Sequence, residues 1–120
     1  MTQEQKELLL KDLCARLPYD VKIQFDYIIT SPAILKGIDK NLIECDIAVC
    51  EIEDVKPYLF PLSSMTEEQK CEFIDTCTLL RDSAFGWTDR TFDWLNKNHF
   101  DYRELIPMGL AIDATGLNIY

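Results

Sequence analysis

Apolar residues at every second position in the first half of the chain most constrain its fold. One segment carries them at Val21, Ile23, Phe25 and Tyr27. A second carries them at Ile43, Cys45, Ile47 and Val49. A period of two is typical of antiparallel strands buried on one face. We therefore expect strands over 21–27 and 42–52. Ser31-Pro32 should break the first strand, a weaker strand should cover 33–38, and a tight turn should cover 39–41.

A helix over 3–16 precedes these strands. Thr2 and Gln5 have the spacing of a capping box, in which each side chain bonds the backbone of the other. Pro18 ends the segment. Apolar residues at helical spacing form a ridge along this segment: Leu9, Leu10, Leu13, Cys14 and Leu17. The apolar face of a sheet must pack against another element. We therefore expect this ridge and the alternating apolar residues of the strands to pack against each other in one core.

The second half of the chain favours an extended loop followed by helices. Pro57 and Pro61 exclude a helix between 56 and 65. Thr66 with Gln69 predicts a helix over 67–81, and Thr88 predicts one over 89–97. Asp101 should cap a short turn through Ile106. The tail, 109–120, should form a hairpin or a strand at the sheet edge, with a turn over 113–116.

Several side-chain positions follow from helical spacing. Inward-facing positions are expected at Phe73, Ile74, Cys77, Leu80, Phe92 and Leu95. Trp94 lies off the second stripe and should be exposed. Arg81 should lie near the C-terminus of the 67–81 helix, where the helix dipole favours a positive charge. The expected fold class is α+β, as one domain over 1–120. It has an N-terminal helix, an antiparallel three- to four-stranded sheet, and then two to three C-terminal helices.

Charge and composition argue against several classes of partner. The formal net charge is −9, and both halves of the chain are acidic. Phosphate backbones and anionic membranes are bound through lysine and arginine, so we expect neither nucleic acid nor membrane as a partner. The first residues lack the basic and apolar regions of a signal peptide, and no apolar run approaches the length of a bilayer span. These features favour a cytoplasmic protein.

The cysteines do not have the spacing of a metal site or of a disulfide framework. There are five, which is an odd number. Cys45 and Cys50 should point to opposite faces of one strand, and Cys71 and Cys77 should lie about 120° apart on a helix. We expect buried thiols that act as small apolar side chains. No glycine-rich phosphate loop is present, so no cofactor is expected.

Four stretches resemble a known family. They are 11–19 (KDLCARLPY), 55–68 (VKPYLFPLSSMTEE), 98–103 (NHFDYR) and 105–111 (LIPMGLA). Together they resemble small uncharacterised proteins of Bacteroides-group gut bacteria, often encoded in prophages and other mobile elements. The resemblance implies an intracellular bacterial or phage accessory protein. It implies no catalytic residue.

Two groups of residues are candidates for function. The 56–65 segment, with Lys56, Pro57, Tyr58 and Phe60, is stiffened by proline and offers apolar surface for binding, unless its aromatic rings fold back over the sheet. His99 is the only histidine, and Arg103 lies four residues later.

Two hypotheses for function follow from these residues. The first is a non-enzymatic interaction protein whose partner is a protein, with no catalytic or metal residue and an oligomeric state, monomer or homodimer, that the sequence leaves open. The alternative is a hydrolase-like or metal-dependent enzyme that uses His99 with a thiol or carboxylates. The competing structural role for His99 is a position at a helix end.

Overall fold

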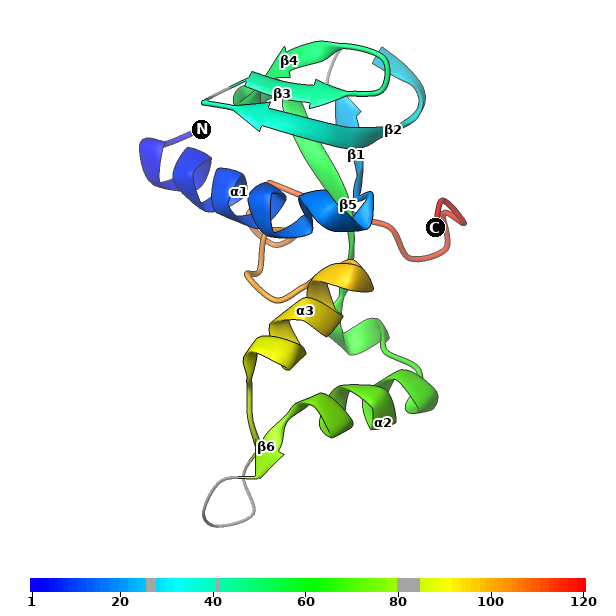
Figure 1. Cartoon of the computed structure of the whole chain (residues 1–120). Helices are drawn as coiled ribbons and strands as arrows, with labels where there is room; N and C mark the ends of the chain where they lie inside the picture. Colours follow the sequence, from blue (N-terminus) through cyan, green and yellow to red (C-terminus); the bar gives the residue numbers. More distant parts are fainter. Residues whose placement is uncertain (26–27, 41, 80–84) are drawn as a thin grey trace.

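The computed structural model describes residues 1–25, 28–40, 42–79 and 85–120, and it has two parts (Figure 1). A twisted sheet is covered by the N-terminal helix, and a lobe of two helices projects from the other end of the sheet. The α-helices are α1 (Gln3–Arg16), α2 (Glu67–Thr76) and α3 (Asp89–Lys97). Single 3₁₀ turns occur at Leu17–Tyr19, Ile52–Asp54 and Leu62–Ser64. Of the helices described, none has the length and apolar character needed to cross a bilayer.

The α+β class is confirmed, but the sheet is larger than expected and is not wholly antiparallel. Its strands are β1 (Lys22–Phe25), β2 (Ile28–Asp39), β3 (Leu42–Cys45), β4 (Val49–Glu51), β5 (Val55–Pro61), β8 (Phe100–Asp101) and β9 (Ile112–Asp113). Within the described residues the sheet has seven strands in the order β4-β3-β2-β1-β5-β8, with β9 also on β5. The pairs of β5 with β8 and β9 are parallel. A separate small ribbon joins β6 (Thr78–Leu79) to β7 (Phe85–Gly86).

The expected break at Ser31-Pro32 is wrong, because β2 continues through Pro32. The pairing of β1 with β2 changes register between Ile23↔Ala33 and Phe25↔Ile28, and Pro32 lies inside that irregular stretch. On the other side, β3 pairs with β2 only from Leu35 onward. Proline is tolerated at such an irregularity because no ladder hydrogen bond is required from its nitrogen.

The single strand expected over 42–52 is instead the hairpin of β3 and β4. At the turn, the Cys45 N–H donates to the Ala48 carbonyl at 2.9 Å, and the Asp46 carboxylate accepts from the Ile34 N–H at 3.0 Å. The reversal changes which positions face inward. Cys50 is buried opposite Ile43, whereas Val49 is 59% exposed, so the predicted inward face fails after Cys45.

The expected 56–65 loop is for the most part an interior strand. β5 pairs with β1 on one side and with β8 on the other. Pro57 lies opposite Ile23, and Pro61 is the last residue of the strand. The prolines exclude a helix, as expected. They do not prevent a strand, because the fixed φ angle of proline is compatible with an extended backbone.

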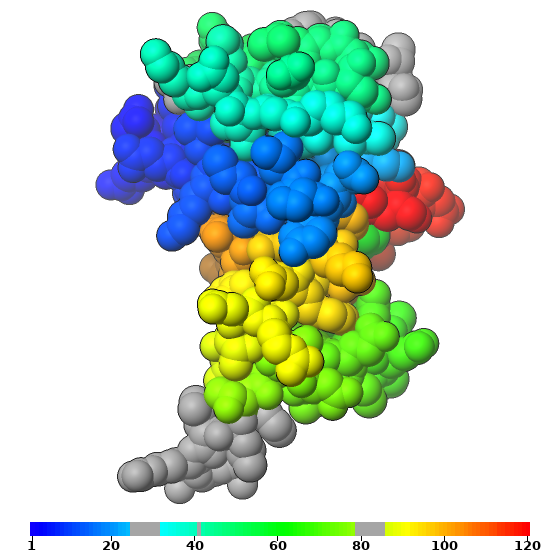
Figure 2. Space-filling model, in the orientation of Figure 1, coloured from blue at the N-terminus to red at the C-terminus, as the bar shows by residue number. Residues whose placement is uncertain are grey.

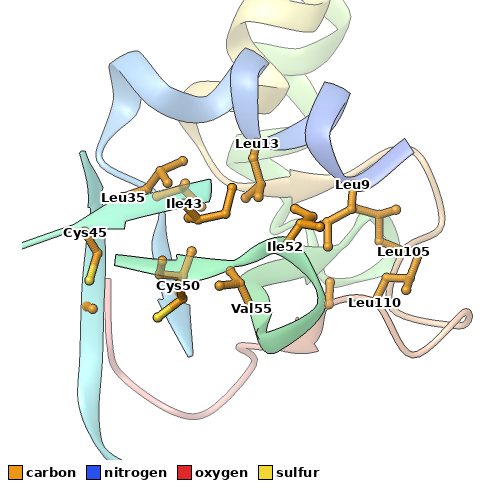
Figure 3. Packing of buried hydrophobic residues seen from close by; sticks show 14 of the residues in the cluster. Leu9, Leu13, Leu35, Ile43, Cys45, Cys50, Ile52, Val55, Leu105 and Leu110 are labelled. Atoms are coloured by element: carbon orange, nitrogen blue, oxygen red, sulfur yellow. The ribbon is translucent and has the colours of Figure 1, made fainter. Parts of the chain in front are cut away.

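The core confirms the central expectation, since Leu9 and Leu13 of α1 pack against the inward face of the sheet (Figure 3). Leu10 and Leu17 border this core, whereas Cys14 is exposed, contrary to expectation. The buried cluster contains Leu9, Leu13, Val21, Ile23, Ala33, Leu35, Ile43, Cys45, Cys50, Ile52, Val55, Leu59, Leu105, Leu110 and Ala111. The last three come from the C-terminal segment, which therefore closes the same interior.

The helix α2 begins at its predicted capping box but ends at Thr76 instead of 81. The Thr76 carbonyl accepts from the Thr88 and Thr91 hydroxyls at 2.8 and 3.0 Å, and Cys77 is extended. These contacts with the start of α3 end the helix. No α2 residue is buried, so the predicted stripe is wrong for Ile74, which is exposed.

Two other positions of that stripe lie within the described residues. Phe73 is half-buried, and Cys77 lies just beyond the end of the helix. Leu80 and Arg81 lie outside the described residues.

The helix α3 matches its predicted bounds, with the Thr88 cap completed by Thr91. Leu95 is buried as expected, but the two aromatic predictions are reversed. Phe92 is 39% exposed, and Trp94 is half-buried, because its ring stacks on Phe100 at 5.5 Å.

The C-terminal segment lies on the main sheet as a short strand, not as a hairpin, because β9 pairs with Tyr58 and Leu59. The Asp101 carboxylate accepts from the N–H groups of Leu105 and Ile106 at 2.9 Å each. It therefore caps a turn that includes Leu105 and Ile106, as expected, although this turn is not helical. The turn bond of the tail joins the Leu117 N–H to the Ala114 carbonyl, one residue later than expected.

Leu13→Ala should lower the free energy of unfolding by about 2–5 kcal/mol, because it leaves a cavity between α1 and the sheet. Leu42→Ala is the matched control, since the same atoms are removed from a side chain that is 47% exposed. The control should change the free energy by less than about 0.5 kcal/mol. Urea unfolding followed by circular dichroism measures both. Equal effects would contradict the assignment of this core.

Candidate functional site

The structure separates the predicted binding residues of β5. Pro57 is buried, Lys56 is half-buried, and neither forms part of an open loop. Tyr58 and Phe60 are half-buried. Phe60 packs against Phe100 and Tyr120, with ring centroids 6.1 and 5.7 Å apart. The rings thus partly cover the sheet, which agrees with the alternative that they fold back over it, and this strand does not present an exposed apolar loop.

His99 contacts β5 through its own carbonyl and through the ring of Tyr120. The rings of His99 and Tyr120 stack with centroids 3.8 Å apart. The Tyr120 hydroxyl donates to the Tyr58 carbonyl and accepts from the Lys22 N–H, each at 2.8 Å. The His99 carbonyl accepts from the Phe60 N–H at 2.8 Å. These contacts form a clasp that fastens the C-terminal segment to β1 and β5.

The environment of His99 keeps its imidazole neutral. Burial, with the positive charges of Arg16 and Lys22 and despite the opposing charge of Asp20, lowers the His99 pKa from 6.5 to about 4. Its Nδ1 is buried and has no hydrogen-bond partner among the described residues. The nearby Asp101 carboxylate is bound to two backbone N–H groups. His99 therefore stands directly after α3 without a carboxylate to orient it as a base.

The cysteines also differ from expectation. Cys45 and Cys50 face the same side of the hairpin and both are buried, because the chain reverses between them. Cys14 and Cys71 are exposed, so only part of the set acts as core. Across 1–25, 28–40, 42–79 and 85–120, no three His, Cys, Asp or Glu residues are placed to hold a metal ion.

Arg103, the last of the predicted binding residues, belongs to a buried ion cluster. Asp12 of α1 is fully buried and accepts from Arg16 Nε at 2.8 Å and from Arg103 Nη1 at 2.7 Å. Arg16 is also fully buried, and its Nη2 donates to the Phe100 carbonyl at 2.6 Å. This Asp12 cluster, defined by Asp12, Arg16 and Arg103, joins α1 to β8 and to the segment after it.

Tyr102 connects the Asp12 cluster to the surface. Its hydroxyl accepts from Arg103 Nη1 at 2.8 Å and donates to the Asn96 side chain at 2.9 Å. The guanidinium carbons of Arg103 and Arg16 lie 4.6 and 5.3 Å from the centroid of its ring. Such cation–π contacts and hydrogen bonds fix the orientation of the Tyr102 ring.

Trp87 and Phe92 pack on the outer side of that ring. The three rings meet edge to face, with centroids 5.5 Å apart for Trp87–Phe92, 5.4 Å for Phe92–Tyr102 and 6.4 Å for Trp87–Tyr102. Trp87 is 42% exposed, like Phe92 at 39%. We call Trp87, Phe92, Tyr102 and Arg103 the aromatic face. It is preorganised, because a buried ion cluster holds its base and α3 holds one edge.

The aromatic face contains the residue types that dominate binding energy at protein interfaces. Tryptophan, tyrosine and arginine are enriched at such positions, where large rigid side chains bury apolar area at a low entropic cost. Helical spacing assigned Phe92 to the core and so missed this surface. A usable signal was Asp12 with Arg16, an ion-pair spacing of i and i+4, but an exposed pair would have the same spacing.

Asp12→Asn should lower the free energy of unfolding by about 3–5 kcal/mol, because it leaves the buried Arg16 without its countercharge. Glu67→Gln is the matched control, since it removes one carboxylate charge from the exposed pair with Lys70. That change should cost no more than about 1 kcal/mol. Denaturant titrations of both variants measure the free energy of unfolding. A loss for Asp12→Asn no larger than that of the control would contradict a structural role for the cluster.

The stability should also depend on pH through His99. Between pH 6.5 and 4 the unfolded chain binds a proton at this residue that the folded chain excludes, so the free energy of unfolding falls as pH falls across that range. His99→Phe retains a ring against Tyr120 and removes the titration. Unfolding at pH 7 and at pH 4.5 should show a smaller loss for this variant. The same loss in both proteins would contradict the assignment.

No family model matches the chain, and neither the curated proteins nor the solved structures provide a match.

Proposed function

We propose that this protein is a non-enzymatic interaction protein whose aromatic face binds a protein partner. The observation that carries the proposal is the exposed pair Trp87 and Phe92, which lies on a ring held from beneath by buried charge. Large apolar side chains that are exposed and clustered are typical of interaction surfaces. Binding to a fixed surface loses less conformational entropy than binding to a mobile one.

The lobe that carries this face projects from the body of the molecule. In Figure 2 the α2 and α3 regions, coloured green to yellow, lie below the sheet and α1. The helix α2 contributes no buried residue, so it adds little to the main core. A projecting lobe is accessible to a large partner, which supports a role in recognition.

The charge of the chain favours a basic partner. With a net charge of −9, the protein attracts basic proteins and repels acidic ones during encounter. The same charge disfavours nucleic acid as a partner. We place the protein in the cytoplasm, as an accessory protein of a phage or mobile element. This placement is supported by the family resemblance and by the odd number of cysteines, which suits a reducing compartment.

No observation favours the alternative, a hydrolase-like or metal-dependent enzyme using His99. A general base needs a proton donor or acceptor within reach and a pKa near the working pH. The pKa of His99 lies near 4, and its ring is stacked on Tyr120.

Trp87→Ser combined with Phe92→Ser should abolish binding of the specific partner. Affinity capture from lysate of the producing cells, followed by mass spectrometry, identifies proteins that the wild type retains and this variant loses. In the matched control, Leu42→Ser with Val49→Ser, two similarly exposed apolar side chains are removed from the β3–β4 hairpin. The control should retain the partner.

The purified complex then gives the size of the loss in affinity. Trp87→Ala should raise the Kd by roughly 30-fold or more. This increase corresponds to a loss of about 2 kcal/mol in binding free energy, as expected for a residue that dominates an interface. Isothermal titration calorimetry measures it. A partner list that is unchanged by the Trp87 and Phe92 substitutions, or lost equally in the hairpin control, would reject the aromatic face as the binding surface.

A further inference from the structure

A groove lies between α2 and α3, apart from the aromatic face. Its volume is about 430 Å³, within the range of ligand-binding clefts. The two helices lie side by side in the lower lobe (Figures 1 and 2). The groove is lined by Glu72, Asp75 and Thr76 of α2 and by Arg90, Trp94, Lys97 and Asn98 at α3.

The two walls of the groove carry opposite charge. Glu72 and Asp75 are three residues apart and share one face of α2. Arg90 and Lys97 are seven residues apart, with Trp94 between them at i+4, so they form one stripe along α3. At 100° per residue, this stripe points roughly opposite to Phe92. The groove therefore opens on the side of α3 away from Phe92. Phe73 of α2 lies between the two surfaces, because its ring contacts both Trp87 and Trp94, with centroids 5.7 and 5.9 Å apart.

Within the described residues, the charged groups that line the groove form no ion pair. In the part of the chain that the structure describes, no ion pair links the acidic wall to the basic wall, although α2 forms one pair of its own between Glu67 and Lys70. A ligand with one kind of charge would satisfy one wall and be repelled by the other. The groove fits an occupant that presents an acidic stripe and a basic stripe side by side.

The α2–α3 groove is itself such a surface. We propose that a second copy of this chain docks on it, groove to groove, related by a twofold axis that runs along the groove. Rotation about that axis places α2 of each copy opposite α3 of the other. Glu72 and Asp75 then face the partner's Arg90 and the partner's Lys97, and the same contacts occur twice.

The charges select this one arrangement. A twofold axis across the groove would instead place α2 opposite α2 and the acidic walls against each other, which is repulsive. In the selected dimer the long stems of Arg90 and Lys97 extend across the opposing grooves and fill them. Their methylene groups and the Trp94 ring supply apolar contact. The dimer leaves Trp87 and Phe92 available, so the inference goes beyond the proposed function.

Charge reversal tests the dimer with the full chain alone. Sedimentation equilibrium of the wild type should give about twice the chain mass of 13.9 kDa at an ionic strength of about 0.15 M, which screens the repulsion between two chains that each carry a net charge of −9. Glu72→Lys with Asp75→Lys makes both walls basic, and Arg90→Glu with Lys97→Glu makes both walls acidic. Each variant alone should dissociate at concentrations roughly tenfold or more above the wild type, because like charges now meet.

Mixing the two variants gives the decisive result. An equimolar mixture should form a heterodimer, because basic walls now meet acidic walls, and added salt should weaken it. Circular dichroism confirms that both variants are folded. A monomeric wild type, variants that dimerise alone, or a mixture that stays monomeric would each overturn the proposal. Phe92→Ser should remain dimeric, because the Phe92 ring contacts Trp87 and Tyr102 on the side of α3 away from the groove, which separates this test from that of the aromatic face.

Discussion

The rest of the structure depends on one buried carboxylate, that of Asp12. It lies on α1, whose leucines cover the sheet, and it binds Arg16 of the same helix and Arg103 from the distant C-terminal segment. Arg16 in turn binds the Phe100 carbonyl of β8. One side chain thus connects the helix, the sheet edge and the base of the α2–α3 lobe. Burying these charges is costly, and the hydrogen bonds of the cluster offset part of that cost, although Arg16 Nη1 is buried without a hydrogen-bond partner among the described residues.

Surface and interior are coupled through Tyr102. Its ring lies against two guanidinium groups and supports Trp87 and Phe92, while its hydroxyl bonds Asn96 of α3. The His99–Tyr120 clasp acts in parallel, because it ties the C-terminal segment to β1 and β5 through backbone groups. In the clasp, the His99 ring is stacked on Tyr120. We propose that recognition uses the aromatic face and the charged walls of the groove.

Prediction succeeded where the signal was local and failed where a distant contact decided. The capping boxes at Thr2, Thr66 and Thr88 fixed three helix starts, since these bonds lie within four residues. The end of α2 could not be predicted, because its last carbonyl is bound by hydroxyls from Thr88 and Thr91. The same applies to Trp87 and Arg103. Their roles depend on Asp12 and Tyr102, and spacing along the chain does not show that they meet.

The sequence by itself determined the α+β class, the leucine ridge of α1 and the inward positions Val21, Ile23, Ile43 and Cys45, because periodicity and caps act over a few residues. Only the tertiary structure decided that the proline-rich segment is an interior strand, that 42–52 reverses as a hairpin, and that β8 and β9 join β5 in parallel. These outcomes depend on pairing between segments far apart in sequence. Backbone hydrogen bonds are made by every residue type, so side-chain patterns do not reveal which segment supplies the partner.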